Sequence, residues 1–372
     1  GIILAKNQLA KAYKIQTAEP IWQAQRKCPG LVLVAPHREI YSRVSQQMNE
    51  IFLRYTDLVE PASIDESYLD LTGSLHLFGG DAKAVADRIR AEVHKEAGIT
   101  VSVGVSFCKT FAKLGSDYKK PDATTVFSRA QMKELVWPLP VGSMLYVGGR
   151  FEQQLRELGI HTIGDLAQSD EGLLRKKFGI RGESAWHCAN GDEHDPVRPY
   201  HEHRESKSIG NSITFRRDLI GRRDIQLGFT ALAESVSERM RRHGVHCRTV
   251  QIQIRDPAFH TISRQVTLER SVSLFRELTD TAMALAEHCW DFSKPVRLLA
   301  LTAEQLIPIE QDTEQLTLFP DAAAPAREKQ GRLEDALSSI RGKYGKGSIQ
   351  LGSFLGNDLG LGGSGNKLKN DE

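Results

Sequence analysis

The sequence predicts an α+β fold divided among several domains, on three observations. Strand and helix patterns alternate over residues 1–133 and again over 208–306, whereas residues 134–198 hold only short helical patterns. A polar stretch of mixed charge, 192–207, is typical of a linker. At 372 residues the chain is long enough for two or more domains, each with its own core.

Apolar spacing predicts the elements of residues 1–133. Ile40, Val44, Met48 and Ile51 recur at helical spacing, and Gly98 ends another helical pattern. The predicted helices are 7–13, 20–27, 39–55, 81–97 and 110–118. The predicted strands are 2–5, 31–36, 58–60, 67–71, 101–107 and 124–127. This order is typical of a ferredoxin-like sheet that lacks its first strand.

Apolar spacing also predicts the elements of the second α+β region, residues 208–306, and of the C-terminal part. The predicted strands are 249–254, 261–268 and 295–301, and the predicted helices are 225–242 and 274–290. Beyond them, Leu333, Leu337, Ile340 and Tyr344 mark an amphipathic helix. The glycine-rich residues 352–365 are predicted to be mobile.

Composition narrows the class of protein. A charged fraction of 26% with 40% hydrophobic residues is typical of soluble proteins, and the net charge of +2 requires any nucleic-acid surface to be local. The cysteines are scattered without a Cys-x-x-Cys pair, which favours reduced thiols in the cytoplasm over disulfides or zinc. No apolar run is long enough for a membrane span. The chain begins at Gly1 on an apolar run, and we expect it to be cut from a longer protein.

An adjacent pair of carboxylates, Asp65 and Glu66, stands between two predicted strands. Neighbouring side chains of a regular strand point to opposite faces, so the pair shares one target only at a turn. A β-hairpin would raise both groups to the rim of a sheet, where hard oxygen ligands suit Mg²⁺. The alternative is an ordinary solvated turn, which is the commoner role of such a dipeptide.

Two longer strings carry a family resemblance. Residues 63–72, SIDESYLDLT, closely resemble the palm signature of Y-family translesion DNA polymerases, and residues 101–121, VSVGVSFCKTFAKLGSDYKKP, resemble the second palm segment. The resemblance implies a right-hand polymerase with a ferredoxin-like palm. Its expected domains are fingers (1–40), palm (41–133), helical thumb (134–198), α+β little finger (199–308), and a clamp-binding linker with a C-terminal tail (309–372).

The resemblance also implies a set of site residues. Asp65 and Glu66 match the family's adjacent metal-binding pair, which holds two Mg²⁺ ions for nucleotidyl transfer. Lys120 matches the lysine that grips the incoming triphosphate, and Lys11 matches a cationic position of the fingers. The family's third carboxylate lies on a first palm strand that we expect this chain to lack, and this makes activity of the chain alone doubtful.

The predicted DNA contacts lie in two places. YVGGR at 146–150, followed by LRELGIHTIGDL at 155–166, resembles a helix-hairpin-helix in which Gly148, Gly149 and Arg150 face a DNA phosphate. Tyr146 occupies the position of the family's usual first glycine, and a plain helical hairpin is the alternative. Arg216 and Arg217, with the pairs at 222–223 and 241–242, are candidates for tracking a phosphate backbone, or are solvated surface charges.

A short peptide predicts a protein partner. QLTLF at residues 315–319 matches the pentapeptide with which bacterial polymerases bind the sliding clamp. Leu318 and Phe319 would enter an apolar pocket, with Leu316 beside them and Gln315 as a polar anchor. A strand is the alternative, but the neighbouring Ala/Pro-rich residues favour a ligand.

The sequence therefore predicts a bacterial translesion polymerase: a cytoplasmic monomer that binds primer-template DNA, dNTP and the sliding clamp, but no membrane. One rival is a clamp-associated DNA-binding accessory factor without catalysis. A second is a helix-hairpin-helix repair enzyme, such as a glycosylase or nuclease, for which Asp165 is the candidate catalytic group.

Overall fold

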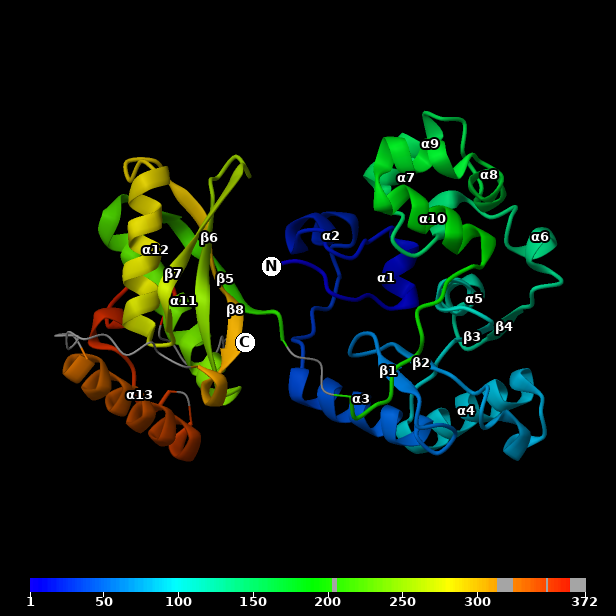
Figure 1. Ribbon diagram of the computed structural model, residues 1–372, viewed down its shortest axis with the longest axis horizontal. Coiled ribbons are helices and arrows are strands. Elements are labelled where there is room, and N and C mark those ends of the chain that lie inside the picture. The colour runs from blue at the N-terminus through cyan, green and yellow to red at the C-terminus, as the bar shows by residue number, and fades with distance from the viewer. Residues whose placement is uncertain (203–205, 313–323, 346, 362–372) are drawn as a thin grey trace. The chain divides into compact units, whose positions relative to one another are not determined.

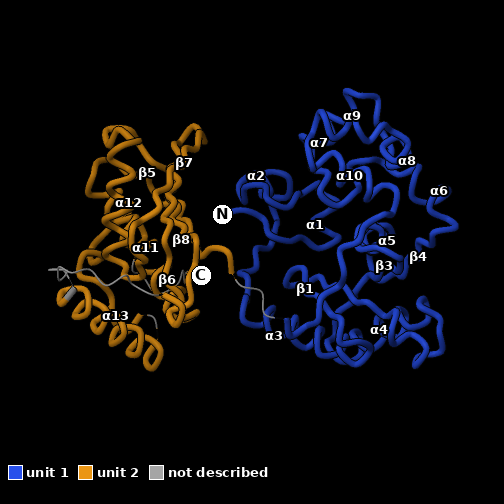
Figure 2. Tube along the Cα trace, in the orientation of Figure 1, with its two compact units in different colours: residues 1–203 blue, residues 204–372 orange. Residues whose placement is uncertain are grey.

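The chain forms two compact units, residues 1–203 and 204–372, which are coloured separately in Figure 2. The boundary falls inside the stretch 192–207 that the sequence predicts as a linker. Each unit has its own hydrophobic core. The structure is a computed structural model, and the residues that it describes are 1–202, 206–312, 324–345 and 347–361.

Unit 1 is mainly helical, with short strands (Figure 1). Its helices are α1 (Gln8–Ala12), α2 (Ile21–Lys27), α3 (Arg38–Phe52), α4 (Ala82–Ala97), α5 (Lys109–Tyr118), α6 (Met132–Leu135), α7 (Gly149–Arg156), α8 (Ile163–Ala167), α9 (Glu171–Phe178) and α10 (Ile180–Asn190). Its strands are β1 (Val59–Pro61), β2 (Ser67–Leu69), β3 (Val103–Ser106) and β4 (Thr124–Phe127). The five helices predicted before residue 119 are confirmed, as is the helical character of 134–198.

The four strands of unit 1 form two sheets. β1 and β2 make an antiparallel hairpin in which Glu60 pairs with Tyr68. β3 and β4 run parallel, with α5 as the crossover helix between them. Among the described residues these two pairs do not join into the single ferredoxin-like sheet that the element order predicts. The α+β class is confirmed, whereas the continuous sheet is corrected to two separate ribbons.

Two predicted strands near the start of the chain are wrong. The segment 2–5 makes only an isolated bridge, between Ile2 and Pro20, and the described segment 31–36 forms no strand. Val32 and Val34 are 81% and 79% exposed, so this apolar run is not buried. A strand needs a partner for its backbone groups, and β-branched composition alone does not supply one.

The helices α7 and α8 share a core with α5 and β4. Phe111 of α5 and Phe127 of β4 are buried in one cluster with Phe151, Leu155 and Ile163 from α7 and α8. A second cluster packs α3 and α4 against β1. Because the first cluster crosses from the sheet to the helices, the helical hairpin has a fixed position relative to β3, β4 and α5.

Unit 2 is a four-stranded antiparallel sheet in the order β5-β8-β6-β7, with helices α11 and α12 packed on it (Figure 1). The elements are β5 (Ser208–Leu219), α11 (Gly221–Arg242), β6 (Val245–Arg255), β7 (Thr261–Val272), α12 (Phe275–Cys289) and β8 (Val296–Pro308). The three predicted strands and two predicted helices are confirmed. The sequence misses β5, because polar residues interrupt the apolar alternation of this edge strand.

The C-terminal part of unit 2 differs from its prediction. Helix α13 (Ala324–Tyr344) forms, but Leu333 and Tyr344 are 52% and 67% exposed, whereas Glu334 is buried. Within the predicted mobile tail, Phe354 and Leu359 are buried in the main core of unit 2, so residues 352–361 are packed. No helix in the described residues is both long and apolar enough to span a membrane.

Candidate active site

The turn between β1 and β2 carries the carboxylate pair. Asp65 and Glu66 are exposed at this turn, as the predicted hairpin requires. The Ser63 hydroxyl donates to Asp65 Oδ1 at 2.7 Å, and the backbone N–H groups of Ala62 and Ser63 both donate to the Glu66 carbonyl. The turn is therefore held by its own backbone and by Ser63, and both carboxylates remain exposed.

A chain of alternating charges leads from this pair to Lys120. Lys113 Nζ on α5 lies 2.6 Å from Glu66 Oε1 and 2.9 Å from Asp117 Oδ2. Lys120 Nζ lies 2.6 Å from the other oxygen of Asp117. The structure thus links two of the predicted residues, Glu66 and Lys120, through Lys113 and Asp117, which the sequence does not single out.

The ion pairs in this chain shift the pKa values of its middle members. Partial burial opposes the charged form of Lys113, but hydrogen bonds to Glu66 and Asp117 outweigh it and raise the pKa of the lysine. Burial likewise opposes the charged form of Asp117, yet Lys120 and Lys113 lower its pKa below the usual value. Lys113 is therefore a fixed positive charge beside Glu66 at neutral pH.

The donor set fits a hard divalent cation. Two adjacent carboxylates, both exposed and on one tight turn, supply the oxygen ligands that Mg²⁺ prefers, and substrate phosphates complete its usual shell. Glu66 is paired with the Lys113 ammonium group, whereas Asp65 bonds to the Ser63 hydroxyl. Asp65 and Glu66 are thus the side chains that would hold the metal.

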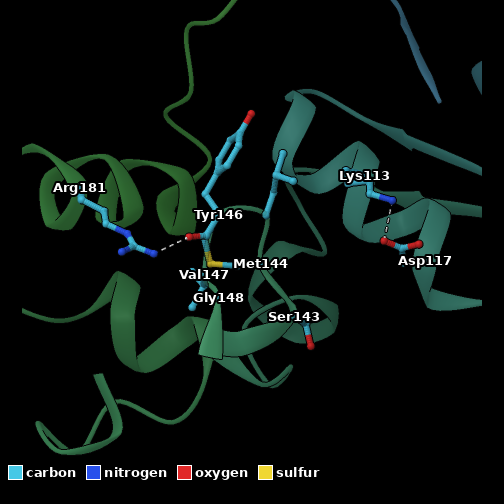
Figure 3. A pocket seen from close by; sticks show the side chains of 9 residues that line it. Lys113, Asp117, Ser143, Met144, Tyr146, Val147, Gly148 and Arg181 are labelled. Carbon is cyan, nitrogen blue, oxygen red and sulfur yellow. Dashed lines mark hydrogen bonds and ion pairs between the residues drawn. The ribbon is translucent and has the colours of Figure 1, made fainter. Parts of the chain in front are cut away.

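A cavity of about 500 Å³ adjoins the carboxylate region. Lys113 and Asp117 line one side, and residues 143–148 with Arg181 line the other (Figure 3). Gly148 is the N-cap of α7, and a side chain at Gly148 or Gly149 would meet no atom within 4 Å. The first amides of a helix lack intrahelical partners, so this turn offers open N–H groups beside an exposed Arg150.

Comparison with known proteins agrees with this geometry. Residues 1–117 match the family model described as the impB/mucB/samB family, and residues 206–318 match the model of its C-terminal domain. A DNA polymerase IV of Acetivibrio thermocellus is 41% identical over 362 residues, which are 97% of this chain and 89% of that protein. The chain belongs to the Y family of DNA polymerases.

Further similarities cover most of this Y-family chain. DNA polymerase IV 1 of Bacillus subtilis is 37% identical over 95% of the chain and 84% of its own length. A solved structure described as a Y-family DNA polymerase chimera, Dbh-Dpo4(243-245)-Dbh, matches with a TM-score of 0.71 at 21% identity. It covers 82% of this chain and 88% of its own, and it shows the same fold.

Asp165, in the predicted helix-hairpin-helix of this Y-family chain, has a structural role. Its Oδ2 accepts the backbone N–H groups of Thr162 at 2.8 Å and His161 at 3.0 Å, while the Thr162 hydroxyl accepts the N–H of Asp165. This capping box begins α8. Asp165 is thus fully engaged as a helix cap, which removes the reason to assign it to a repair enzyme.

The remaining predicted residues are placed separately. Lys11 is exposed on α1 of unit 1. Arg216 and Arg217 lie on β5 of unit 2, where Arg217 bonds to Asp358 at 2.6 Å and to Asp224 at 2.5 Å. The predicted clamp-binding residues Gln315, Leu316, Leu318 and Phe319 lie outside the described residues.

Lys113 and Asp117 are the site residues that the sequence-based reasoning overlooks. Their spacing of four residues on a helix is a visible signal for an ion pair. Their place beside Glu66 is not visible, because it depends on the packing of α5 next to the β1–β2 hairpin.

Proposed function

We propose that this chain is a template-directed DNA polymerase of the translesion type, adding deoxynucleotides during DNA damage bypass and repair. The observation that carries the proposal is the exposed pair Asp65 and Glu66 on a hairpin turn, in a chain of the Y family. Glu66 is paired with Lys113, which lines a cavity together with Asp117 and Arg181. Nucleotidyl transfer depends mainly on positioning and charge stabilisation, and this site supplies groups for both.

Asp65 and Glu66 would hold two Mg²⁺ ions, as hard oxygen ligands suited to this cation. When bound, the metal lowers the energy of negative charge that develops on the phosphoryl oxygens. Lys113 keeps the Glu66 carboxylate in position through its 2.6 Å contact. Lys120 and Lys11 would bind the triphosphate, and the exposure of Lys120, at 53%, leaves it accessible to an incoming nucleotide.

The DNA contacts are proposed from both units. Gly148, Gly149 and Arg150 would bind a backbone phosphate at the start of α7, where the glycines leave open space. Arg216 and Arg217 would meet the DNA from β5, and Arg217 would exchange Asp358 or Asp224 for a phosphate. The peptide 315–319 would attach a monomeric, cytoplasmic enzyme to the sliding clamp and raise its effective concentration at the primer end.

A comparison of Asp65→Asn with Asp57→Asn tests the catalytic assignment. Both substitutions remove one exposed carboxylate from the same part of unit 1, and Asp57 is outside the proposed site. Primer extension with Mg²⁺ and dNTP should fall at least about a hundredfold for Asp65→Asn only, because metal stabilisation of the transition state is worth several kcal/mol. Mg²⁺-dependent binding of dNTP to the primer-template complex should fall in parallel.

The affinity for primer-template DNA distinguishes a polymerase from a non-catalytic DNA-binding accessory factor. Asp65→Asn should keep this affinity, because the change lies outside the proposed DNA contacts. Equal extension by Asp65→Asn and the unsubstituted chain would disprove the assignment of the metal site. A chain that binds DNA, but shows neither extension nor Mg²⁺-dependent dNTP binding, would instead be the non-catalytic accessory factor.

A further inference from the structure

Tyr146 has an unusual backbone conformation in the turn before α7. Its φ of +67° lies in the left-handed region, which glycine adopts freely and a tyrosine rarely does. The side chain is 77% exposed, although the neighbours Met144 and Val147 are 3% and 6% exposed. Two buried anchors therefore hold the turn and project a large aromatic ring between them.

The orientation of the ring leaves the start of α7 open. Figure 3 shows the Tyr146 ring extending from the turn on the side away from Gly148. Arg181 Nη2 donates to the Tyr146 carbonyl oxygen at 3.2 Å, and the Arg181 guanidinium lies 4.2 Å from the centre of the Phe151 ring. Because Arg181 is itself held against Phe151, its hydrogen bond fixes the backbone of the turn from which the ring projects.

The surroundings of the ring suit one kind of ligand. Tyr146 lines the cavity of about 500 Å³ together with two cationic side chains, Lys113 and Arg181. Lys113 is in turn bound to Glu66 of the carboxylate pair. An apolar ring face beside cations and open helix amides matches a nucleotide of a DNA strand, whose sugar is apolar on its C–H face and whose phosphate is anionic.

We propose that Tyr146 packs against a deoxyribose of the DNA strand that binds at the start of α7 and leads to Asp65 and Glu66. This inference rests on the proposed polymerase function and adds a contact residue to it. The phosphate is bound by the amides of the turn, and the ring, which extends away from Gly148, covers a sugar further along the same strand. The hydroxyl of Tyr146 has no part in the contact.

The test measures equilibrium binding of a fluorescent primer-template by Tyr146→Gly and Tyr146→Phe, without dNTP. Tyr146→Gly should weaken binding about fivefold, as expected for roughly 40 Å² of apolar ring returned to water. The temperature of unfolding should not fall, because glycine accepts the positive φ without strain. Tyr146→Phe should bind like the unsubstituted chain. The slope of log Kd against log salt should stay the same in both, because no charge is removed.

Ala18→Gly is the matched control. Ala18 is also exposed, with a φ of +68°, so the substitution relieves the same backbone strain without removing a ring. It should leave DNA affinity unchanged. Equal or tighter binding of primer-template by Tyr146→Gly would overturn the inference, because the ring would then contribute nothing to DNA affinity or would reduce it. Failure of the unsubstituted chain to bind primer-template would overturn the proposed function itself.

Discussion

In each unit, a buried charged side chain joins two segments that are far apart in the sequence. In unit 1, Lys109 of α5 is 7% exposed and lies 2.7 Å from both Glu60 of β1 and Asp195, which follows the last helix of the unit. In unit 2, Glu334 of α13 is 3% exposed and accepts hydrogen bonds from Arg241 and Ser237 of α11. In both places a buried charge helps to fix a peripheral segment.

The two attachments differ in where the buried charge resides. In unit 1 it belongs to the core helix, and the attached segment brings Asp195, which is 54% exposed, and Glu193, whose carboxylate accepts the N–H of Thr110. In unit 2 the attached helix itself carries the buried charge. A buried group loses more when its partner is removed, because it cannot turn to water instead. The attachment in unit 1 should therefore depend most on Lys109, and that in unit 2 on Glu334.

Lys109→Met should have the largest effect on stability. It leaves Glu60, which is 13% exposed, without its ammonium partner, and the free energy of unfolding of unit 1 should fall by about 3 kcal/mol. Hydrogen exchange in residues 193–200 should rise at the same time. Burial opposes the charged form of Lys109, but Asp195 and Glu60 raise its pKa above 10.5, so its contribution is complete at neutral pH and is lost only as pH rises through that raised value.

Lys83→Met is the control for this change. Lys83 is 57% exposed and pairs with Asp87 one helical turn away, so its removal should lower stability by no more than about 0.5 kcal/mol. Equal losses from Lys83→Met and Lys109→Met in urea unfolding would show that burial of the ammonium group is unimportant in unit 1.

Glu334→Gln should have an intermediate effect, confined to unit 2. The carboxylate also accepts the N–H of Phe275 at the start of α12, and an amide cannot accept all of these donors. We expect a loss of about 2 kcal/mol, since hydrogen bonds to a charged group contribute more than neutral ones. Faster hydrogen exchange in α13 and in the first turn of α12 would locate the change.

Asp335→Asn provides the comparison within α13. Asp335 also contacts Arg241, at 3.0 Å, but is 67% exposed. A substitution there should change stability by only a few tenths of a kcal/mol. If Asp335→Asn releases α13 as strongly as Glu334→Gln, then the helix is held by net charge rather than by the buried carboxylate.

Local sequence patterns predict a helix or strand well where the residues that stabilise it are close together in the sequence. The helices α3, α4, α5, α11 and α12 are confirmed because each has a complete apolar face within its own residues. Residues 31–36 have a strand composition, but strand formation depends on a partner elsewhere in the chain. In α13 the apolar spacing predicts the helix but not its orientation, which the pairing of Glu334 with Arg241 decides.

The same limit applies to the candidate site. The exposed turn with Asp65 and Glu66 is predictable because the two strands and the turn lie within about a dozen residues. The ion pairs of Lys113 with Glu66, and of Arg217 with Asp358, join residues far apart in the sequence. Counting basic residues could not show that Arg217 already has carboxylate partners in unit 2.

Among the three main substitutions, Asp165→Asn should have the smallest effect, and it shows what a purely local carboxylate contributes. All the hydrogen bonds of its carboxylate are made within four residues, to the backbone of Thr162 and His161. A neutral amide oxygen accepts these hydrogen bonds less strongly than a carboxylate, so the free energy of unfolding should fall by about 1 kcal/mol at neutral pH. These backbone hydrogen bonds lower the pKa of Asp165 below 3.8. The contribution of its charge to stability is therefore complete above that pH and is lost as pH falls through the lowered value.

The stability difference between Asp165→Asn and the unsubstituted chain should therefore vanish in acid. Glu157→Gln is the control, because it changes an exposed carboxylate of the same hairpin, and it should show almost no difference at either pH. A difference that persists in acid would mean that the shape of the side chain, not its charge, begins α8.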